Sequence, residues 1–443
     1  MTSTTTRPED GFYVLVTGAN SGLGFAIGCR LIDEFLQTRP HSQTLVLIIT
    51  TRSTRKGDDT IRQLQQHLQN VCRKAEKSIT GIRMPLERRV RFQQEILDLN
   101  SILSVQRLAK RLRQSIPKLN AVILNAGIGG WEGVNWPSAF YLLLTDWKHA
   151  VTWPQFKISG VGWVTKPQIP ADAAGNKVEE PPLGEVFCSN VFGHYLLGHY
   201  LAPLLAAHEE KEGTTGRLIW LSSLEAYAST FSFDDFQGLQ SKQPYEESKR
   251  LTDVLALTSH LPATSPLVNQ YFNTAKPTGT GATKAKPKMY LTQPGICATS
   301  IFPIHFALAL LMTLSFYVAR WLGSQWHGVT ASKGACAPVW VALAEQSVLD
   351  TMEEREGKGK WGSATDFWGR ERVERTEVEG WGWGGIVGEF SGRKGRWRFA
   401  KDLTEQSRQE FEELGKGCWT EIERLREDWE TRLVAAGVGE ELD

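Results

Sequence analysis

The chain has 443 residues, which is long for one domain of about 100–200 residues and short for three, so we expect one large α/β core with insertions and an appendage. Its 50 basic and 49 acidic residues leave a formal net charge of +1, which argues against a nucleic-acid-binding surface and against a polybasic membrane anchor. A hydrophobic fraction of 41% with 22% charged residues supports a core and excludes disorder over the whole chain.

The cysteines and the N-terminus predict a chain that faces the cytosol. No two cysteines form a C-x-x-C pair and none clusters with histidines at zinc-ligand spacing, so we interpret all six as reduced packing residues. Residues 1–10 lack the apolar stretch of a secretory signal, which predicts no secretion. The cysteines are Cys29, Cys72, Cys188, Cys297, Cys336 and Cys418.

The first predicted unit is a strand, a glycine turn and a helix. Residues 11–17 form an apolar run rich in β-branched and aromatic side chains, which predicts a buried strand. The run leads directly into TGANSGLG at 17–24, and residues 25–36 then have helical spacing.

The same alternation continues down the chain. Apolar strands are predicted at 45–49, 89–97, 121–124 and 216–223, and helical stretches follow the first two of them, to about residue 71 and around 105–112. Strands that alternate with helices indicate a doubly wound parallel sheet of the Rossmann type, with helices on both faces.

Two segments interrupt this alternation. The stretch between Gly127 and Pro182 carries five tryptophans and is too long for a simple loop, so we expect a folded insertion near the strand ends. Residues 301–319 contain no Asp, Glu, Lys or Arg over a length near the roughly 20 residues that span a bilayer. Three interpretations are open for 301–319: a transmembrane span, a monotopic segment in one leaflet, or a buried lid over the substrate.

The C-terminal part changes composition. Residues 353–398 are rich in Gly, Trp, Arg and Glu, and residues 403–434 place apolar side chains at helical spacing among charges, which predicts an amphipathic helix that packs on the core or forms an oligomer contact. We therefore expect a catalytic core at 1–300 with its insertion at about 128–182, an apolar segment at 301–325, the end of the core at 326–400, and the helix at 401–443.

The glycine turn predicts a nucleotide site. Gly18, Gly22 and Gly24 lie where a strand passes into a helix, so the backbone can turn tightly and the helix N-terminus can face a pyrophosphate. The residues after the second strand are Thr51 and Arg52, a hydroxyl and a cation suited to a 2′-phosphate, in place of the acid that would bind the ribose of NAD. We therefore predict NADPH as the cofactor.

A tyrosine and a lysine supply the candidate chemistry. Tyr245 and Lys249 are four residues apart, so they share a helix face and the ammonium can favour the phenolate, lowering a tyrosine pKa that is normally about 10. Ser223 ends the strand at 216–223 and adds a hydroxyl, with Ser222 as its rival for the same role. The set predicts a proton donor for a carbonyl group.

In motif order over about residues 11–299, the sequence resembles the short-chain dehydrogenase/reductase family. The motifs are TGANSGLG at 17–24, Asp98-Leu99, Asn125-Ala-Gly127, Asn190, Ser223, Tyr245-Glu-Glu-Ser-Lys249 and Pro294-Gly295. The resemblance implies that Tyr245 is the general acid, that Ser223 holds the substrate oxygen, that Lys249 binds the nicotinamide ribose, and that Asn190 supports a proton relay through water.

The resemblance also implies the remaining cofactor contacts. Asp98 would contact the adenine, Asn125 the adenosine side, and Thr299 with the backbone near Cys297 the nicotinamide amide. The glycine turn would contribute Gly18, Ser21, Gly22, Leu23 and Gly24. Ser223 and Tyr245 lie 22 positions apart, longer than is common in the family, and residues 229–241 therefore look like a loop at the mouth of a site for a large substrate.

More narrowly, the sequence is similar to the fungal 3-keto-steroid reductases of ergosterol biosynthesis. The similar features are Gly129-Gly-Trp-Glu-Gly133, the run at 182–195, the lengthened Ser–Tyr segment, and Trp361 to Trp368 with Glu379-Gly-Trp381 beyond. This implies reduction, with NADPH, of the 3-ketone left after sterol C-4 decarboxylation to a 3β-alcohol, at the endoplasmic reticulum and lipid droplets beside the other C-4 demethylation enzymes.

Two alternatives remain, a retinal or general carbonyl reductase of the same family and a nucleotide-binding scaffold for other sterol enzymes. The tryptophans either line an apolar sterol pocket or pack the insertion's own core. If residues 360–368 hold the last core strand, a span at 301–319 would separate that strand from its sheet, so we favour peripheral or monotopic attachment to the membrane.

Overall fold

The computed structural model describes residues 11–152, 156–171, 178–207, 214–272, 286–298, 306–389, 393–396 and 400–440. At its centre is an eight-stranded sheet in the order β10-β9-β8-β7-β4-β1-β2-β3. Its strands are β1 (Gly11–Val16), β2 (Thr44–Thr51), β3 (Val90–Ile96), β4 (Ala121–Leu124), β7 (Arg217–Leu221), β8 (Lys288–Gln293), β9 (Lys360–Thr365) and β10 (Glu371–Thr376).

The strand pairing confirms the predicted doubly wound sheet. Every neighbouring pair is parallel except β9 and β10, which form an antiparallel hairpin at one edge. The chain moves outward from β1 to β3 in one direction and from β4 to β10 in the other, so the order reverses between β1 and β4. A ligand of such a sheet binds at the carboxyl end of the strands beside this reversal.

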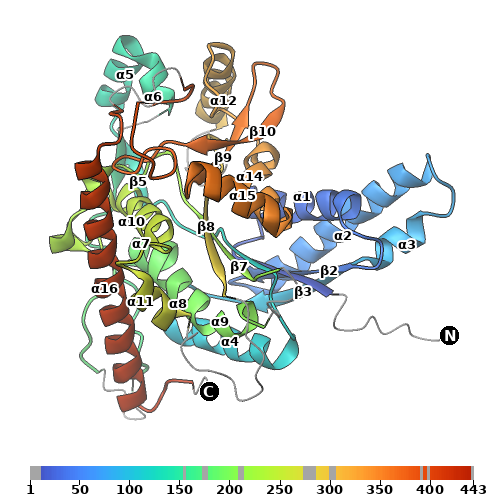
Figure 1. Ribbon diagram of the computed structural model, residues 1–443, viewed down its shortest axis with the longest axis horizontal. Coiled ribbons are helices and arrows are strands. Elements are labelled where there is room, and N and C mark those ends of the chain that lie inside the picture. The colour runs from blue at the N-terminus through green and yellow to red at the C-terminus, as the bar shows by residue number, and fades with distance from the viewer. Residues whose placement is uncertain are drawn as a thin grey trace.

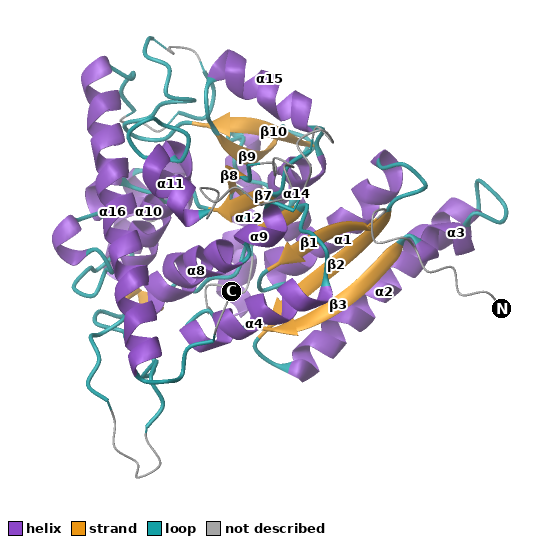
Figure 2. Ribbon diagram, turned by 60° about the horizontal axis from the view of Figure 1, so that its bottom comes forward, coloured by secondary structure: helices purple, strands orange, loops and turns teal. Residues whose placement is uncertain are grey.

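The strands between the two edges of the sheet are buried on both faces, which explains the continuous apolar sequence of β1, β2, β4 and β7, whereas the edge strands β3 and β10 are partly exposed. In β1, Leu15 faces one core cluster while Val14 and Val16 face the other. Helices α1, α2 and α14 cover the second cluster, and α4, α8 and α10 cover the first. Figure 2 shows the strands between these two sets of helices.

The helices alternate with the strands along the chain. They are α1 (Gly22–Thr38), α2 (Thr54–Glu76), α3 (Arg83–Arg88), α4 (Ile102–Ser115), α7 (Glu185–Phe187), α8 (Gly193–Tyr200), α9 (Ala202–Leu205), α10 (Pro244–Thr258), α11 (Ser265–Tyr271), α13 (Ala331–Gly334), α14 (Cys336–Leu343) and α15 (Gln346–Glu356). One π-helical turn spans Cys188–Phe192, and 3₁₀ turns span Ala228–Thr230 and Phe233–Asp235.

The tryptophan-rich insertion is folded. It contains β5 (Trp131–Val134) and β6 (Lys157–Ser159), which pair antiparallel, and between them α5 (Trp136–Thr145) and α6 (Trp147–Thr152). Helix α6 contacts α12 (Phe306–Trp321), and both lie at the top of Figure 1 with α5.

The apolar segment predicted at 301–319 overlaps α12, while its residues 301–305 lie outside the described part of the chain. Among the described residues, no helix combines the length and the hydropathy that a bilayer crossing requires. β9 pairs with β8 in the main sheet, as expected if residues 360–368 hold a core strand.

The predicted C-terminal amphipathic helix is α16 (Glu405–Ala435), and it packs on α10 and α11 along one side of the molecule (Figure 1). Thr404 begins it with a capping box in which the Thr404 hydroxyl accepts from the backbone N–H of Ser407. Trp419 and Trp429 are almost fully buried, and the Trp419 indole donates to the Leu255 carbonyl at 3.2 Å. The helix is therefore part of the core rather than a mobile tail.

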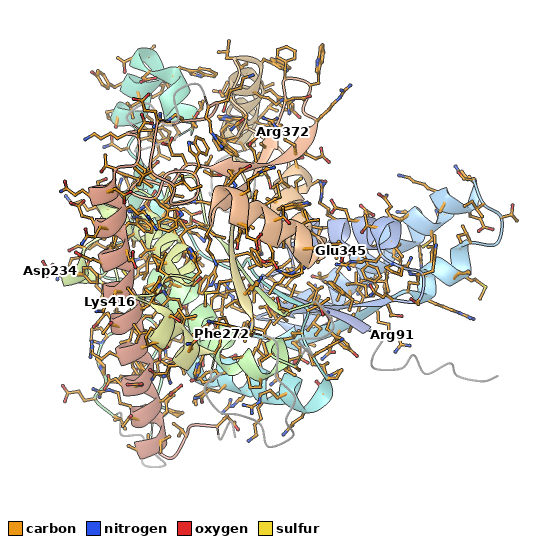
Figure 3. All side chains as sticks on the ribbon, viewed as in Figure 1. Arg91, Asp234, Phe272, Glu345, Arg372 and Lys416 are labelled. Atoms are coloured by element: carbon orange, nitrogen blue, oxygen red, sulfur yellow. The ribbon has the colours of Figure 1, made fainter. Side chains whose placement is uncertain are left out.

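The segment at 229–241 packs beside this helix. Phe236 is buried against Phe187 of α7, and Phe233 lies against Gly417 of α16. Asp234 is exposed at the outer edge, where Figure 3 labels it beyond α16.

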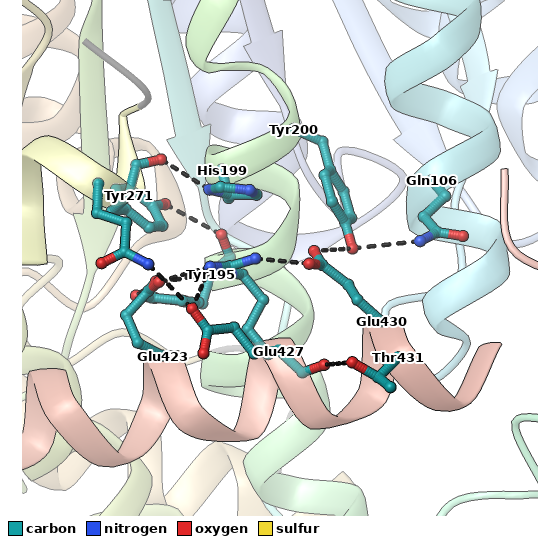
Figure 4. A network of polar contacts seen from close by, with 11 residues as sticks. Gln106, Tyr195, His199, Tyr200, Tyr271, Glu423, Glu427, Glu430 and Thr431 are labelled. Atoms are coloured by element: carbon teal, nitrogen blue, oxygen red, sulfur yellow. Dashed lines mark hydrogen bonds and ion pairs between the residues drawn. The ribbon is translucent and has the colours of Figure 1, made fainter. Parts of the chain in front are cut away.

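A buried polar network ties α16 to α8 (Figure 4). The Arg426 guanidinium contacts Glu423 at 2.7 Å and Glu430 at 2.6 Å, and the Arg426 and Glu423 side chains are less than a tenth exposed. The Tyr195 hydroxyl donates to Glu423, and the Tyr200 hydroxyl donates to Glu430 at 2.9 Å. The carboxylates are thus compensated by a cation and by hydroxyl donors, which is the condition for burying charge.

We expect Arg426→Met to lower the free energy of unfolding by about 3–5 kcal/mol, because it leaves the Glu423 carboxylate buried without its cation. Replacing both partners, as Glu423→Gln with Arg426→Met, should recover much of this loss. The matched control is Arg424→Met on the same helix, whose ion pair with Glu421 is largely exposed and should be worth about 0–1 kcal/mol. Equal losses for the two single variants in denaturant titrations would contradict this account of α16.

Candidate active site

The glycine turn connects β1 to α1 at the strand-order reversal. Gly18 and Gly22 have φ of +65° and +53°, a backbone region that favours glycine. At Gly24 a Cβ would lie 2.2 Å from the Gly18 carbonyl oxygen, so no larger side chain fits there. Ser21 and Gly22 are exposed, and the N-terminus of α1 has no acidic residue in its first turn. The turn therefore presents the positive N-terminal end of α1 to an anion.

A buried network fixes this turn to the end of β4. The Thr17 hydroxyl accepts hydrogen bonds from the backbone N–H of Asn125 and of Ala126, both at 2.9 Å, and contacts His194 Nε2 at 2.9 Å. The Asn125 amide donates back to the Thr17 carbonyl at 2.9 Å. Because burial lowers the pKa of His194 to about 3, its ring is neutral at physiological pH. Asn125 thus stabilises the turn from the adjacent strand.

Thr51, the last residue of β2, and Arg52, the residue after it, differ in exposure. Thr51 is buried and its hydroxyl donates to the Ser53 carbonyl at 2.7 Å, so this group serves the local turn. Arg52 is exposed at the carboxyl end of the sheet. Of the predicted pair, Arg52 is the side chain that is free to reach a ligand.

The remaining predicted cofactor residues lie at neighbouring strand ends. Asp98 follows β3 and its carboxylate accepts from the Asn100 backbone N–H at 3.1 Å. Cys297 follows β8, and burial raises the pKa of its thiol to about 12, so it is not a reactive thiolate. Thr299 lies outside the described residues.

Asn190 sits in the π-helical turn and is almost fully buried. Its side-chain oxygen accepts from the Ile128 backbone N–H at 2.8 Å, and its amide donates to the Ile128 carbonyl and to the Ser248 hydroxyl, both at 3.0 Å. Asn190 therefore joins the segment after β4 to α10, one turn from Tyr245.

Tyr245 and Lys249 lie at the start of α10, a helix that is buried over most of its length. The Lys249 ammonium is 5.6 Å from the centroid of the Tyr245 ring and donates to the Leu221 carbonyl at 2.8 Å. The phenol hydrogen-bonds Ser223, whereas the Ser222 hydroxyl donates to Asp253 at 2.5 Å. The structure thus brings Ser223, Tyr245 and Lys249 together and directs the Ser222 hydroxyl to Asp253 and the Lys249 backbone carbonyl, rather than to the Tyr245 phenol.

The pKa of Tyr245 does not fall as the sequence predicts. Burial raises it well above its usual value, and the Glu225 carboxylate raises it further, while the hydrogen bond from Ser223 and the Lys157 ammonium act in the opposite direction. The sequence prediction considered only Lys249, and neither the burial nor the carboxylates can be read from residue spacing.

Lys249 itself is perturbed. Burial lowers its pKa to about 8, and the ammonium of Lys360 on β9 acts in the same direction, while Asp253 opposes both. Lys360 pairs with Asp253 at 2.7 Å, and both side chains are almost fully buried. A strand from the C-terminal part of the chain therefore contributes to the electrostatics of the site.

Sequence reasoning missed three residues that surround Tyr245. Trp131 of β5 packs edge-on against the Tyr245 ring with 4.9 Å between the centroids, Lys157 of β6 lies 5.6 Å from that ring, and Glu225 pairs with Lys157 at 2.8 Å. The tryptophan content signalled an apolar insertion but not which ring reaches the site. A single lysine in a short strand carries no such signal.

Comparisons with curated proteins show close relatives over nearly the whole chain. A 3-keto-steroid reductase of Aspergillus fumigatus is 47% identical over 438 residues, covering 96% of this chain and 95% of the relative. A 3-keto-steroid reductase of Gibberella zeae is 39% identical over 464 residues with the same coverage, and one of Schizosaccharomyces pombe is 32% identical over 83% of this chain and 90% of the relative. No protein-family profile matches the chain.

Among solved structures, an L-sorbose reductase from Gluconobacter frateurii in complex with NADPH and L-sorbose covers 66% of this chain and 72% of its own, at 15% identity and a TM-score of 0.34. A short-chain dehydrogenase from Sphingobium yanoikuyae in complex with NADPH covers 66% and 73%, at 15% identity and a TM-score of 0.35.

The parallel sheet with its glycine turn after β1, and the Ser–Tyr–Lys group after β7 at the same edge of the sheet, define a short-chain dehydrogenase/reductase. Within that class, the chain belongs to the fungal 3-keto-steroid reductases, because its relatives of that name reach 47% identity over almost its entire length.

Proposed function

We propose that the protein uses NADPH to reduce the 3-ketone of a C-4-demethylated sterol intermediate to a 3β-hydroxyl in ergosterol biosynthesis. The observation that carries the proposal is the Tyr245–Lys249 pair, with Lys249 buried and Tyr245 half-buried, in a chain 47% identical to a 3-keto-steroid reductase over 96% of its length. The relatives' name supplies the substrate class, and the residues supply a proton donor and a dinucleotide site.

The residues at the strand ends fit a dinucleotide phosphate. The turn around Gly18, Gly22 and Gly24 offers backbone N–H groups to a pyrophosphate, with Ser21 and Leu23 between the glycines. Arg52 would take the 2′-phosphate, Asp98 the adenine, and Asn125 the adenosine side. Cys297 and Thr299 would lie near the nicotinamide amide. When bound, NADPH supplies the hydride.

The proton comes from the chain itself. Tyr245 is poised to remain protonated, because burial and Glu225 raise its pKa, so its hydroxyl can donate to the substrate oxygen as that oxygen gains negative charge. Ser223 hydrogen-bonds the same phenol and would hold the carbonyl oxygen in place. Lys249 would bind the nicotinamide ribose, and Asn190 would support the replacement of the Tyr245 proton from water.

The first test is turnover by the protein reconstituted in membranes, with a 3-keto sterol or with retinal and with NADPH as the reductant. We expect the sterol alone to be reduced, and Tyr245→Phe to lower kcat by about 10²–10⁴-fold while the affinity for NADPH is retained. Ser222→Ala is the matched comparison with Ser223→Ala, and only the latter should lower kcat strongly. Turnover of retinal alone, or of neither ketone, would contradict the sterol assignment.

Arg52 decides the preference for NADPH in this account. Removing its guanidinium as Arg52→Ala should raise the KM for NADPH about tenfold or more and leave the KM for NADH unchanged, because a charge-assisted contact with phosphate is lost. The control is Arg62→Ala, an exposed arginine further along α2. An unchanged ratio of kcat/KM for the two nucleotides would assign the discrimination to other residues.

We also propose that the protein attaches to a membrane surface through one apolar face. This apolar face consists of exposed side chains on α5, on α12 and in the turn between β9 and β10, namely Phe140, Tyr141, Leu144, Leu310, Leu311, Leu314, Val318, Trp321, Leu322, Phe367 and Trp368. The three elements lie at the same end of Figure 1, α6 contacts α12, and Gly369 of the turn lies against the Arg320 guanidinium.

We propose that a lipid bilayer covers this apolar face, because the proposed substrate is itself a membrane lipid. The apolar face is connected to the site through the insertion, whose β5 carries Trp131 against Tyr245 and continues directly into α5. On the basis of the resemblance, we propose that this membrane is that of the endoplasmic reticulum and lipid droplets, beside the other sterol C-4 demethylation enzymes.

Leu311→Glu combined with Leu314→Glu should reduce the fraction of protein that floats with liposomes by about tenfold, because each buried leucine contributes about 1.5–3 kcal/mol. The matched control is Ile79→Glu, which is 61% exposed, as Leu311 is, but lies after α2 and away from the apolar face. Unchanged flotation of the double variant would contradict attachment through α12.

A further inference from the structure

A buried three-residue ion cluster lies behind the proposed proton donor. The Lys157 ammonium is 2.8 Å from both oxygens of Glu225 and 2.7 Å from Glu246 Oε1. The side chains of Lys157 and Glu246 are less than a tenth exposed, and that of Glu225 is 14% exposed. Lys157 comes from β6 of the insertion, Glu225 from the segment after β7, and Glu246 from α10, so the cluster joins three parts of the chain.

The cluster is in direct contact with the catalytic group. The Lys157 ammonium lies 4.4 Å from the centroid of the Trp131 ring and 5.6 Å from that of Tyr245, and the two rings pack edge-on. The backbone N–H of Glu225 donates to the Ser223 hydroxyl at 3.2 Å. Any movement of Lys157 therefore reaches both Tyr245 and Ser223.

Within the ion cluster itself, the acidic groups outnumber the basic one. Glu225, Glu246 and the phenol of Tyr227 face the same region, with Lys157 from the insertion and Lys249 from α10 as the cations. Burial alone lowers the pKa of Lys157, but its two carboxylate partners raise the pKa above its usual value, so the ammonium stays charged. Within the cluster one cation therefore compensates two carboxylates.

We propose that Lys157 is a positioning residue for Tyr245, through which the insertion fixes the phenol and compensates the two carboxylates that face it. This inference rests on the proposed function, since it assigns to Tyr245 the proton transfer of a ketone reductase. The proposal gives the tryptophan-rich insertion a role in the reaction besides any contact with substrate. The cluster forms only when β6, the strand that carries Lys157, is packed in its place.

The proposal predicts the sign of each charge change. Lys157 lowers the pKa of Tyr245 and Glu225 raises it, so Lys157→Met should move that pKa up and Glu225→Gln should move it down. In the reverse reaction, oxidation of the sterol alcohol with NADP⁺, Tyr245 must accept a proton and the rate rises as pH passes through its pKa. The rising limb should therefore move to higher pH in Lys157→Met and to lower pH in Glu225→Gln, each by about one pH unit.

The experiment measures kcat, KM for NADPH and the pH profile of alcohol oxidation for five variants, of which Glu225→Gln is one. Lys157→Met should lower kcat about tenfold or more with little change in KM, Lys157→Arg should retain most of the activity, and Lys157→Met with Glu225→Gln should return the pH profile toward the wild type. The matched control is Lys166→Met, an exposed lysine in the same insertion. Melting temperatures are measured in parallel.

Two results would overturn the proposal. One is a pH profile in Lys157→Met that is the same as in the wild type. The other is a loss of activity that parallels the loss of melting temperature and is not relieved by Glu225→Gln, because Lys157 would then only stabilise the fold. If the wild type turns over no steroid, the proposed function fails separately. The cluster is then tested by alkaline titration of the phenolate absorbance, with Tyr245→Phe as the reference that identifies the contribution of Tyr245. Glu225→Gln must lower the midpoint of the Tyr245 titration, and an unchanged midpoint contradicts the inference.

Discussion

The position of the half-buried Tyr245 side chain among charged groups is the constraint on which the rest of the site depends. When the phenol gives up its proton, nearby groups must stabilise the negative charge that forms on its oxygen. Each of those groups has its own desolvation cost. Lys157 and Lys249 each lie 5.6 Å from the centroid of the Tyr245 ring, and the pKa of Lys249 in turn responds to Asp253 and to its partner Lys360 of β9. The reacting groups therefore depend on a strand that enters the sheet only after α12.

Helix α10 is held from both sides. On its outer side α16 buries Trp419 against it, and α16 is tied to the neighbouring α8 through the Arg426–Glu423 pair and Tyr195. On its inner side the insertion places Trp131 and Lys157 against Tyr245. A rigid α10 keeps Tyr245 and Lys249 in one geometry, which is the preorganisation that proton transfer needs. The tryptophan-rich insertion and the C-terminal helix α16, which are both additions to the parallel-sheet core, thus stabilise the same helix α10.

Much of the fold could be predicted from local signals. The strand at 121–124 and the turn at 17–24 follow from continuous apolar runs and from glycines in fixed positions, and the amphipathic spacing of 403–434 predicted α16. The antiparallel strand β10 and the contact of Trp131 with Tyr245 could not be predicted, because both depend on tertiary packing. The direction of the Tyr245 pKa was wrong for the same reason, since Glu225 and the burial arise from segments distant from the Tyr–Lys motif.

The central claim is that this chain delivers a hydride to a steroid carbonyl while Tyr245 supplies the proton. The most direct measurement is a single turnover of a 3-keto sterol with NADPH deuterated at C4 of the nicotinamide, followed by mass spectrometry of the alcohol formed. The account predicts one deuterium bonded to C3 of the sterol and an exchangeable proton on the new hydroxyl. A reduced product without deuterium at C3, or no reduced product under saturating NADPH, would contradict it.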